Sequence, residues 1–170
     1  MQAEKSMKKY NITVDEIMKS DCVQSIIEPV WFSVNIYDSL EQYNKDLADF
    51  SLPQRYVFAI QWYSAEVCNG GHDQFFFNST GIVWKDALMG LKEIGAQKIA
   101  EILESAVERM GGTPAFDREE RWNQMDELEP DFDDLDDDFY ESDNLDEIVM
   151  KYIKEHAQDF VFCGEVDIDL

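Results

Sequence analysis

The chain has 170 residues, of which 45% are apolar and 13% aromatic, and its 14 Lys and Arg stand against 37 Asp and Glu, a formal net charge of −23. Disordered acidic chains are poor in aromatic residues, so this composition predicts a folded globule, which we expect to be a single domain over residues 1–170. The negative charge excludes nucleic acids and anionic membrane surfaces as partners, because both attract cationic side chains.

The same composition argues against a membrane or secreted protein. No apolar run reaches the roughly 20 residues that a membrane helix needs. The N-terminal segment 1–10 is polar and lacks the apolar core of a secretion signal. The three cysteines, Cys22, Cys68 and Cys163, are odd in number and far apart, which favours reduced thiols over a disulfide framework. We therefore expect a cytoplasmic protein.

Helix signals follow one another through the first half of the chain. Thr13–Glu16 has the pattern of a capping box, and Asp38–Glu41 resembles a second box that opens a helix through about Phe50. Pro53 suits the first position of the next helix, in which apolar residues recur at helical spacing. The triplet 69–71, Asn-Gly-Gly, predicts the end of that helix, because glycine accepts the left-handed conformation common at helix ends.

The second half continues the helical pattern. Trp84–Glu93 and Ala96–Met110 are predicted as a helical pair broken at Gly95, and Asp143 or Asn144 suits the N-cap of a last long helix. The closing stretch 161–166 fits either a short strand or a tail. The sequence thus predicts an all-α fold, a compact multi-helix domain with an acidic C-terminal helical segment.

The acidic segment is residues 126–147. It holds 13 acids in 22 positions and no Lys or Arg, and residues 86–170 carry a net charge of −19 against −4 for residues 1–85. From just before this segment, apolar residues recur into it every three or four positions, which predicts one buried helix face with a jog at Pro130. These apolar residues are Trp122, Met125, Leu128, Phe132, Leu135 and Phe139.

The charge spacing of this segment points to a function. As one helix, 22 residues would span about 33 Å, or one acid per roughly 2.5 Å, and duplex DNA carries one phosphate charge per about 1.7 Å of its axis. Arginine grips carboxylates bidentately, much as it grips phosphates. We therefore predict that the segment binds cationic side chains of a partner, although charge alone fits an ordinary solvated helix face equally well. The predicted binding residues are Asp131, Asp133, Asp134, Asp136, Asp137, Asp138, Glu141 and Asp143.

Catalytic and metal-binding patterns are weak. Pairs of carboxylates arise by chance among 37 acids, and His72 and His156 are the only histidines of the sequence. The Asp134, Asp136 and Asp138 spacing resembles the start of a calcium loop, but the Gly and Glu that this loop requires are replaced by Phe139 and Leu145. We expect no catalytic residue, no metal and no cofactor.

The most distinctive string is residues 66–81, EVCNGGHDQFFFNSTG. Asn69 and the two glycines favour a turn, residues 75–77 are three phenylalanines expected in the core, and polar side chains can bond turn amides. The string resembles the DNA-mimic protein family, small acidic bacterial proteins that share the block E-x-x-N-G-G-x-x-Q-F-F-x-N. Here the block consists of Glu66, Asn69, Gly70, Gly71, Gln74, Phe75, Phe76 and Asn78.

The resemblance implies an all-helical homodimer whose acidic surface imitates the phosphate backbone and blocks a helix-turn-helix transcription factor. It implies an architectural role for the block, not a binding role. Our leading prediction is a non-catalytic protein that competes with DNA for a basic DNA-binding protein, either a transcription factor or a nucleoid protein.

Three alternatives stay open at this point. An immunity protein or antitoxin that neutralises a basic toxin needs the same electrostatics. A small-ligand binder would use the Glu66–Asn78 turn, with a pocket lined by Glu66, His72 and Gln74. An acidic protein adapted to high salt would spread its acids evenly, which the concentration over residues 126–147 opposes.

Overall fold

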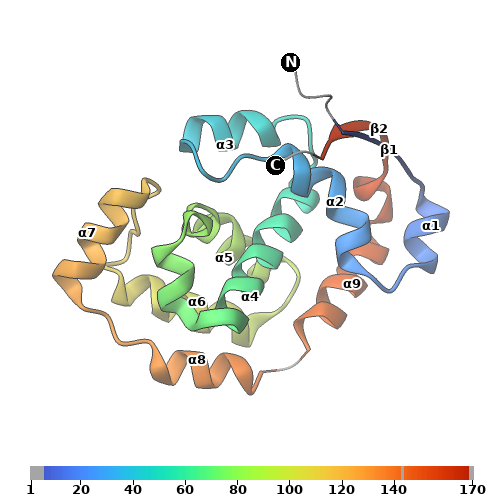
Figure 1. The fold of residues 1–170 in the computed structure, drawn as a ribbon. Helices are drawn as coiled ribbons and strands as arrows, with labels where there is room; N and C mark the ends of the chain where they lie inside the picture. The colour runs from blue at the N-terminus through green and yellow to red at the C-terminus, as the bar shows by residue number, and fades with distance from the viewer. Residues whose placement is uncertain (1–5, 143, 169–170) are drawn as a thin grey trace, which may run out of the picture.

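The protein, seen in a computed structural model that describes residues 6–142 and 144–168, is mostly helical with one small sheet (Figure 1). The helices are α1 (Val14–Lys19), α2 (Val23–Ser33), α3 (Leu40–Leu47), α4 (Leu52–Phe77), α5 (Trp84–Glu93), α6 (Gln97–Arg109), α7 (Arg118–Leu128), α8 (Asp133–Tyr140) and α9 (Leu145–Glu155). Two short 3-10 helices, η1 (Ser79–Val83) and η2 (Ala157–Phe160), and two strands, β1 (Met7–Ile12) and β2 (Phe162–Asp167), complete the described chain. No helix within the described ranges is both long and apolar enough to cross a membrane.

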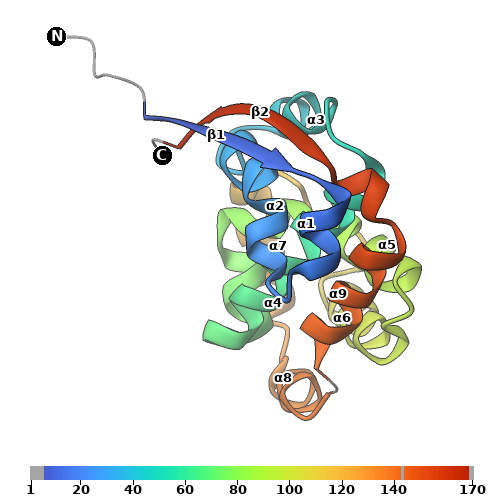
Figure 2. The same ribbon diagram turned by 90° about the vertical axis from the view of Figure 1, so that its right-hand side faces the viewer.

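The sheet corrects the all-α prediction, which holds only as a mostly α fold. β1 and β2 pair antiparallel, from Met7 opposite Asp167 to Ile12 opposite Phe162. The sheet joins the two ends of the described chain and crosses one end of the molecule over α1 and α2 (Figure 2). Tyr10 and Val166 are its buried residues, and Tyr10 packs edge-on against Phe162.

Helix α4 is the centre of the fold. It contacts α2, α5, α7, α8 and both 3-10 helices, and it lies in the middle of the bundle in Figure 1. The reason is its sequence: residues 57–60, Val-Phe-Ala-Ile, are all fully buried, so this part of the helix is apolar on every side.

Several local predictions are confirmed. Thr13 and Glu16 form the capping box, α5 spans the predicted Trp84–Glu93, and Asn144 caps α9 by accepting from the amide of Asp146. The second predicted box is displaced by one residue, because Ser39, not Asp38, accepts the amide of Gln42 at the start of α3.

Helix α4 bends sharply where the Asn-Gly-Gly triplet predicts an end. Gly70 and Gly71 leave the helical conformation, and a second helical stretch starts directly at His72, so no loop separates the two halves. Gly71 has φ 73 and ψ −175, a combination that essentially only glycine adopts. A Cβ at Gly71 would also collide with the carboxylate of Asp136 on α8, so the kink allows these two segments to touch.

The acidic segment is not one helix, which is a correction. α7 ends at Leu128, and its C-cap is Glu129, a non-glycine residue with a left-handed φ of 43. Pro130 follows before α8 begins at Asp133. The predicted buried face holds for Phe132, Leu135 and Phe139, but Leu128 is 46% exposed. The proline ring and the left-handed residue interrupt the helix between α7 and α8, so the acids lie on three helices with two breaks.

Candidate partner-binding surface

Helix α8 is amphipathic, with an apolar side in the core and an acidic side in solvent. Leu135 and Phe139 pack into the core on one side. Asp133, Asp137 and Asp138 are exposed on the other, as the helical periodicity of the segment requires. Burial of the two apolar side chains fixes the helix, and with it the direction in which the carboxylates point.

Two aspartates of α8, Asp134 and Asp136, make side-chain contacts that hold the helix against its neighbours. The first joins α6 to α8: the Arg109 guanidinium donates to both carboxylate oxygens of Asp134, at 2.5 and 2.7 Å, and to the backbone oxygen of Asp131. The hydrogen bond from Arg109 lowers the pKa of Asp134 to about 2. Asp134 therefore remains charged, but one positive charge already accompanies it.

The second contact joins α8 to the kink of α4 through a buried relay. Oδ1 of Asp136 lies 2.5 Å from Nδ1 of His72 and accepts the His72 backbone N–H at 2.9 Å. The other ring nitrogen, Nε2, lies 2.8 Å from the hydroxyl of Tyr63. Burial raises the pKa of Tyr63 well above its usual range, so the hydroxyl keeps its proton and donates to Nε2. The ring Nδ1–H consequently donates to Asp136, and His72 is neutral, since burial also lowers its pKa.

The eight predicted binding residues therefore divide into groups. Asp131, Asp133, Asp137, Asp138 and Glu141 are exposed and make no ion pair with any described residue. Asp134 is exposed but paired, and the Asp136 side chain is only 17% exposed and bonded to His72. Asp143 lies outside the described residues.

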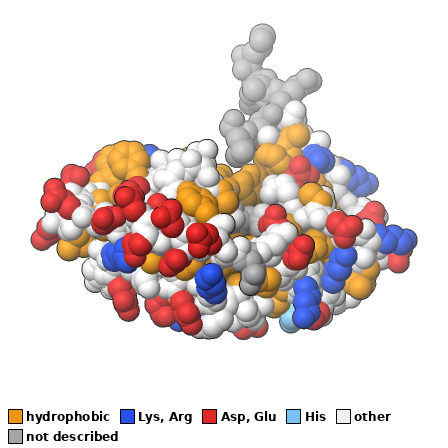
Figure 3. All heavy atoms as spheres, turned by 90° about the horizontal axis from the view of Figure 1, so that it is seen from below, with side chains coloured by type: hydrophobic (Ala, Val, Ile, Leu, Met, Phe, Trp, Pro, Cys, Tyr) orange, Lys and Arg blue, Asp and Glu red, His pale blue; other side chains and the backbone are white. Residues whose placement is uncertain are grey.

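Asp73 extends this surface onto α4, because it directly follows His72, whose backbone N–H donates to Asp136 of α8. Burial raises the pKa of Asp73, and so do the negative charges of Asp136, Asp133 and Asp131. We call the solvent-facing set the acidic face: Asp73, Asp131, Asp133, Asp134, Asp137, Asp138 and Glu141. Figure 3, which views the molecule from the α8 side, has Asp and Glu side chains gathered over one half with few Lys or Arg among them.

The polar side chains of the 66–81 string hydrogen-bond one another. Glu66 accepts from the amides of Gln74, at 2.6 Å, and of Asn78, at 3.0 Å, while Asn69 donates to Gln74. Phe75 and Phe76 are fully buried as predicted, but Phe77 is 51% exposed, because it stacks on Trp122 at the surface. With these polar groups engaged internally, the block fits the architectural role and not the ligand pocket of the alternative prediction.

The end of the second half of α4 depends on a buried cation that sequence reasoning missed. Arg121 of α7 is fully buried and has no carboxylate partner among the described residues. It donates instead to four backbone oxygens, two at the C-terminal end of α4 and two before α7. These oxygens belong to Phe76, Asn78, Ala115 and Phe116. Burial lowers the pKa of Arg121 to about 10.

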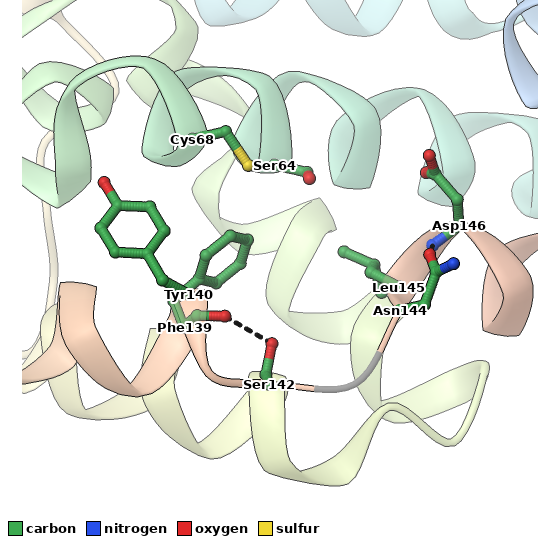
Figure 4. Close-up of a pocket in the computed structure, with 8 residues that line it drawn as sticks. All are labelled: Ser64, Cys68, Phe139, Tyr140, Ser142, Asn144, Leu145 and Asp146. Atoms are coloured by element: carbon green, nitrogen blue, oxygen red, sulfur yellow. Dashed lines mark hydrogen bonds between the residues drawn. The ribbon is translucent and has the colours of Figure 1, made fainter.

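A hollow of about 250 Å³ lies between α4 and the junction of α8 with α9 (Figure 4). Ser64 and Cys68 of α4 face Tyr140 and Ser142 across it. The hydroxyls of Tyr140 and Ser142 donate to the backbone oxygens of Val67 and Phe139, so they support the junction and are not free for a ligand.

Comparison with known proteins identifies a family. The model of a family described as DMP19-like protein matches residues 48–156, which include the α4 kink, α8 and the whole of α9. No curated protein and no solved structure matches the chain. The resemblance to the DNA-mimic protein family is therefore wrong as a family assignment, because the matched family is a different one.

Proposed function

The chain belongs to the DMP19-like protein family, and we propose, from its surface and not from that membership, that it is a non-catalytic protein that competes with DNA. Its acidic face binds the basic, DNA-contacting face of a protein such as a helix-turn-helix transcription factor. The proposal rests on the charges and contacts of α8 and the residues that flank it.

The observation that carries the proposal is the lack of compensating cations on a fixed helix. Several described lysines elsewhere pair with nearby acids, as Lys92 does with Glu104 and Lys8 with Glu28. On the acidic face, Arg109 supplies the one ion pair to an outward carboxylate among the described residues. Like charges on a helix destabilise it, so an uncompensated outward side favours an external positive partner over a merely solvated surface.

The charge density of α8 supports imitation of a phosphate backbone over a short distance. Its eight residues, Asp133–Tyr140, include five Asp and rise about 12 Å, which is one carboxylate per roughly 2.4 Å. Duplex DNA carries one charge per about 1.7 Å. Because the helix is interrupted on both sides, the imitation extends over about one helical segment and its flanks, not over the 33 Å of an unbroken helix.

The proposal is tested by capture and release with DNA. The immobilised protein is exposed to a native cell extract at low salt, and bound proteins are identified by mass spectrometry. We expect the bound proteins to include DNA-binding proteins, and we expect soluble duplex DNA to release them from the immobilised protein at constant ionic strength. The proposal fails if the bound proteins are not released by DNA, or if nothing basic binds.

A matched pair of variants shows whether the acidic face is responsible. Asp137→Asn/Asp138→Asn/Glu141→Gln removes three charges from this face, at the end of α8 where the helix dipole disfavours acids. Asp38→Asn/Asp49→Asn/Glu41→Gln removes the same three charges around α3, at the opposite end of the view in Figure 1. We expect only the first variant to lose its bound proteins at lower salt.

An immunity protein or antitoxin remains the second candidate, since a basic toxin would meet the same face. The capture experiment separates the two. A single basic nuclease or other toxin, inhibited in its activity by the wild-type protein, would replace the proposal of competition for a DNA-binding regulator.

A further inference from the structure

A small hollow lies between the second half of α4 and α7, beside the acidic face. Its volume is about 220 Å³, below the roughly 300 Å³ at which pockets for drug-sized molecules begin. The space therefore suits one side chain. Its lining includes Asp73, Asp126 and Glu129 as carboxylates and Phe77, Trp122 and Met125 as apolar groups.

The three carboxylates of the hollow lack cationic partners. Within the described residues, none of Asp73, Asp126 and Glu129 makes a side-chain hydrogen bond or an ion pair, and no Lys or Arg lines the hollow. The pKa of Asp73 is raised, because burial and the neighbouring acids of α8 both disfavour its negative charge and no cation offsets them. A cation entering the hollow would relieve this repulsion.

The apolar wall of the hollow is an aromatic pair that already attracts a guanidinium. Phe77 and Trp122 stack with ring centroids 5.1 Å apart and an interplanar angle of 23°. The Arg118 guanidinium carbon lies 4.7 Å from the Trp122 ring centroid and 5.6 Å from that of Phe77, and Arg118 is not part of the lining of the hollow. Aromatic faces favour cations, more often Arg than Lys.

The occupant is an organic cation and not a metal ion. No group of three or more acid, His or Cys side chains in the described chain is close enough to hold a metal, so the three carboxylates do not converge on one point. A guanidinium is planar, stacks on aromatic rings and offers five donors to separate carboxylates. An arginine stem would contact Met125 and the rings, as long cationic side chains do on apolar surfaces.

We propose that this hollow is the anchor site for one arginine side chain of the basic protein that the acidic face binds, an inference that rests on the proposed function. The surrounding acids attract the partner, and the hollow selects arginine over lysine. A negative electrostatic field alone attracts arginine and lysine equally, so a preference for arginine would indicate a specific site.

Two peptides of equal charge test the proposal, acetylated hexa-arginine and hexa-lysine, titrated into the whole protein by calorimetry at fixed salt. We expect hexa-arginine to bind roughly two- to fivefold more tightly, the ratio that corresponds to one exposed cation–aromatic contact. The variant Asp126→Asn/Glu129→Gln should abolish this preference. The matched variant Asp137→Asn/Glu141→Gln, which removes the same charge outside the hollow, should weaken both peptides and keep the preference.

A charge-neutral variant completes the test. Phe77→Leu keeps the net charge and an apolar surface at an exposed position, and we expect it to reduce the arginine preference without changing the affinity for hexa-lysine. Equal affinities of both peptides for the wild type, or an equal loss of preference in both double variants, would overturn the anchor site. Failure of the proposed function is seen separately, because the wild type would then capture no protein that DNA releases.

Discussion

The contact between Asp136 and His72 is predicted to hold the acidic helix on the core. Asp136→Ala removes two hydrogen bonds to a carboxylate, and such bonds contribute about 1.5–3 kcal/mol each. Because the Asp136 side chain is 17% exposed, we take the lower value and expect a loss of about 3 kcal/mol in the free energy of unfolding. For a chain of this length that corresponds to a fall in Tm of roughly 6–12 °C.

Urea unfolding followed by circular dichroism measures the loss. Asp137→Ala, at the next position of α8, is the matched control: it is exposed, makes no ion pair with a described residue, and should change stability by less than about 0.5 kcal/mol. Asp136→Asn keeps an oxygen acceptor for His72 and should fall between the two. If Asp136→Ala and Asp137→Ala unfold at the same urea concentration, the relay does not hold α8 and the reasoning is refuted.

Three further predictions concern the same region. Burial lowers the pKa of His72 below its ordinary 6.5, so as the pH falls the unfolded chain takes up a proton before the folded chain does. The free energy of unfolding should therefore decrease as the pH drops below about 6.5. Urea unfolding at successive pH values should show that the His72→Gln variant lacks this contribution to the pH dependence. Arg121→Met leaves four backbone oxygens without their donor and should cost at least about 3 kcal/mol in urea unfolding, and a loss below about 1 kcal/mol would contradict the assigned bonds. The Cβ of Gly71→Ala would collide with the Asp136 carboxylate, whereas a Cβ at Gly95, which also has a positive φ, would meet nothing within 4 Å. Gly71→Ala should therefore have a lower Tm than Gly95→Ala, and equal Tm values would contradict the close approach of α4 and α8.

Local signals account for what the sequence could predict. The Thr13 capping box and the Trp84–Glu93 helix are each determined by residues within a few positions of one another. The same holds for the interruption at Gly70 and Gly71, which the sequence placed correctly but predicted as a helix end and not as a kink. Strand β1 was not predicted, because its partner β2 is far from it in the sequence and Tyr10 is the one buried residue of β1. No local pattern distinguishes such a strand from a polar terminus.

The site was predictable in character but not in detail. The density of acids in residues 126–147 identified the surface, yet nothing in the sequence separates Asp136, which turns inward to His72, from its exposed neighbours. The helical spacing carried through Pro130 suggested one continuous helix, and the left-handed Glu129 that ends α7 had no sequence signal because glycine usually occupies such a position. Arg121 was missed because arginine is almost never fully buried unless it is paired.

The most direct test of the acidic face is the affinity of a captured DNA-binding protein for the two triple variants as salt is raised from about 50 to about 300 mM, a range over which exposed charges become screened. We predict that the wild type and the Asp38/Glu41/Asp49 variant bind equally and lose affinity steeply with salt. The Asp137/Asp138/Glu141 variant should bind about 5- to 150-fold more weakly at low salt, at roughly 0.3–1 kcal/mol for each of the three exposed pairs lost, with a shallower salt dependence. Equal affinities of both triple variants, or a complex insensitive to salt, would contradict the account.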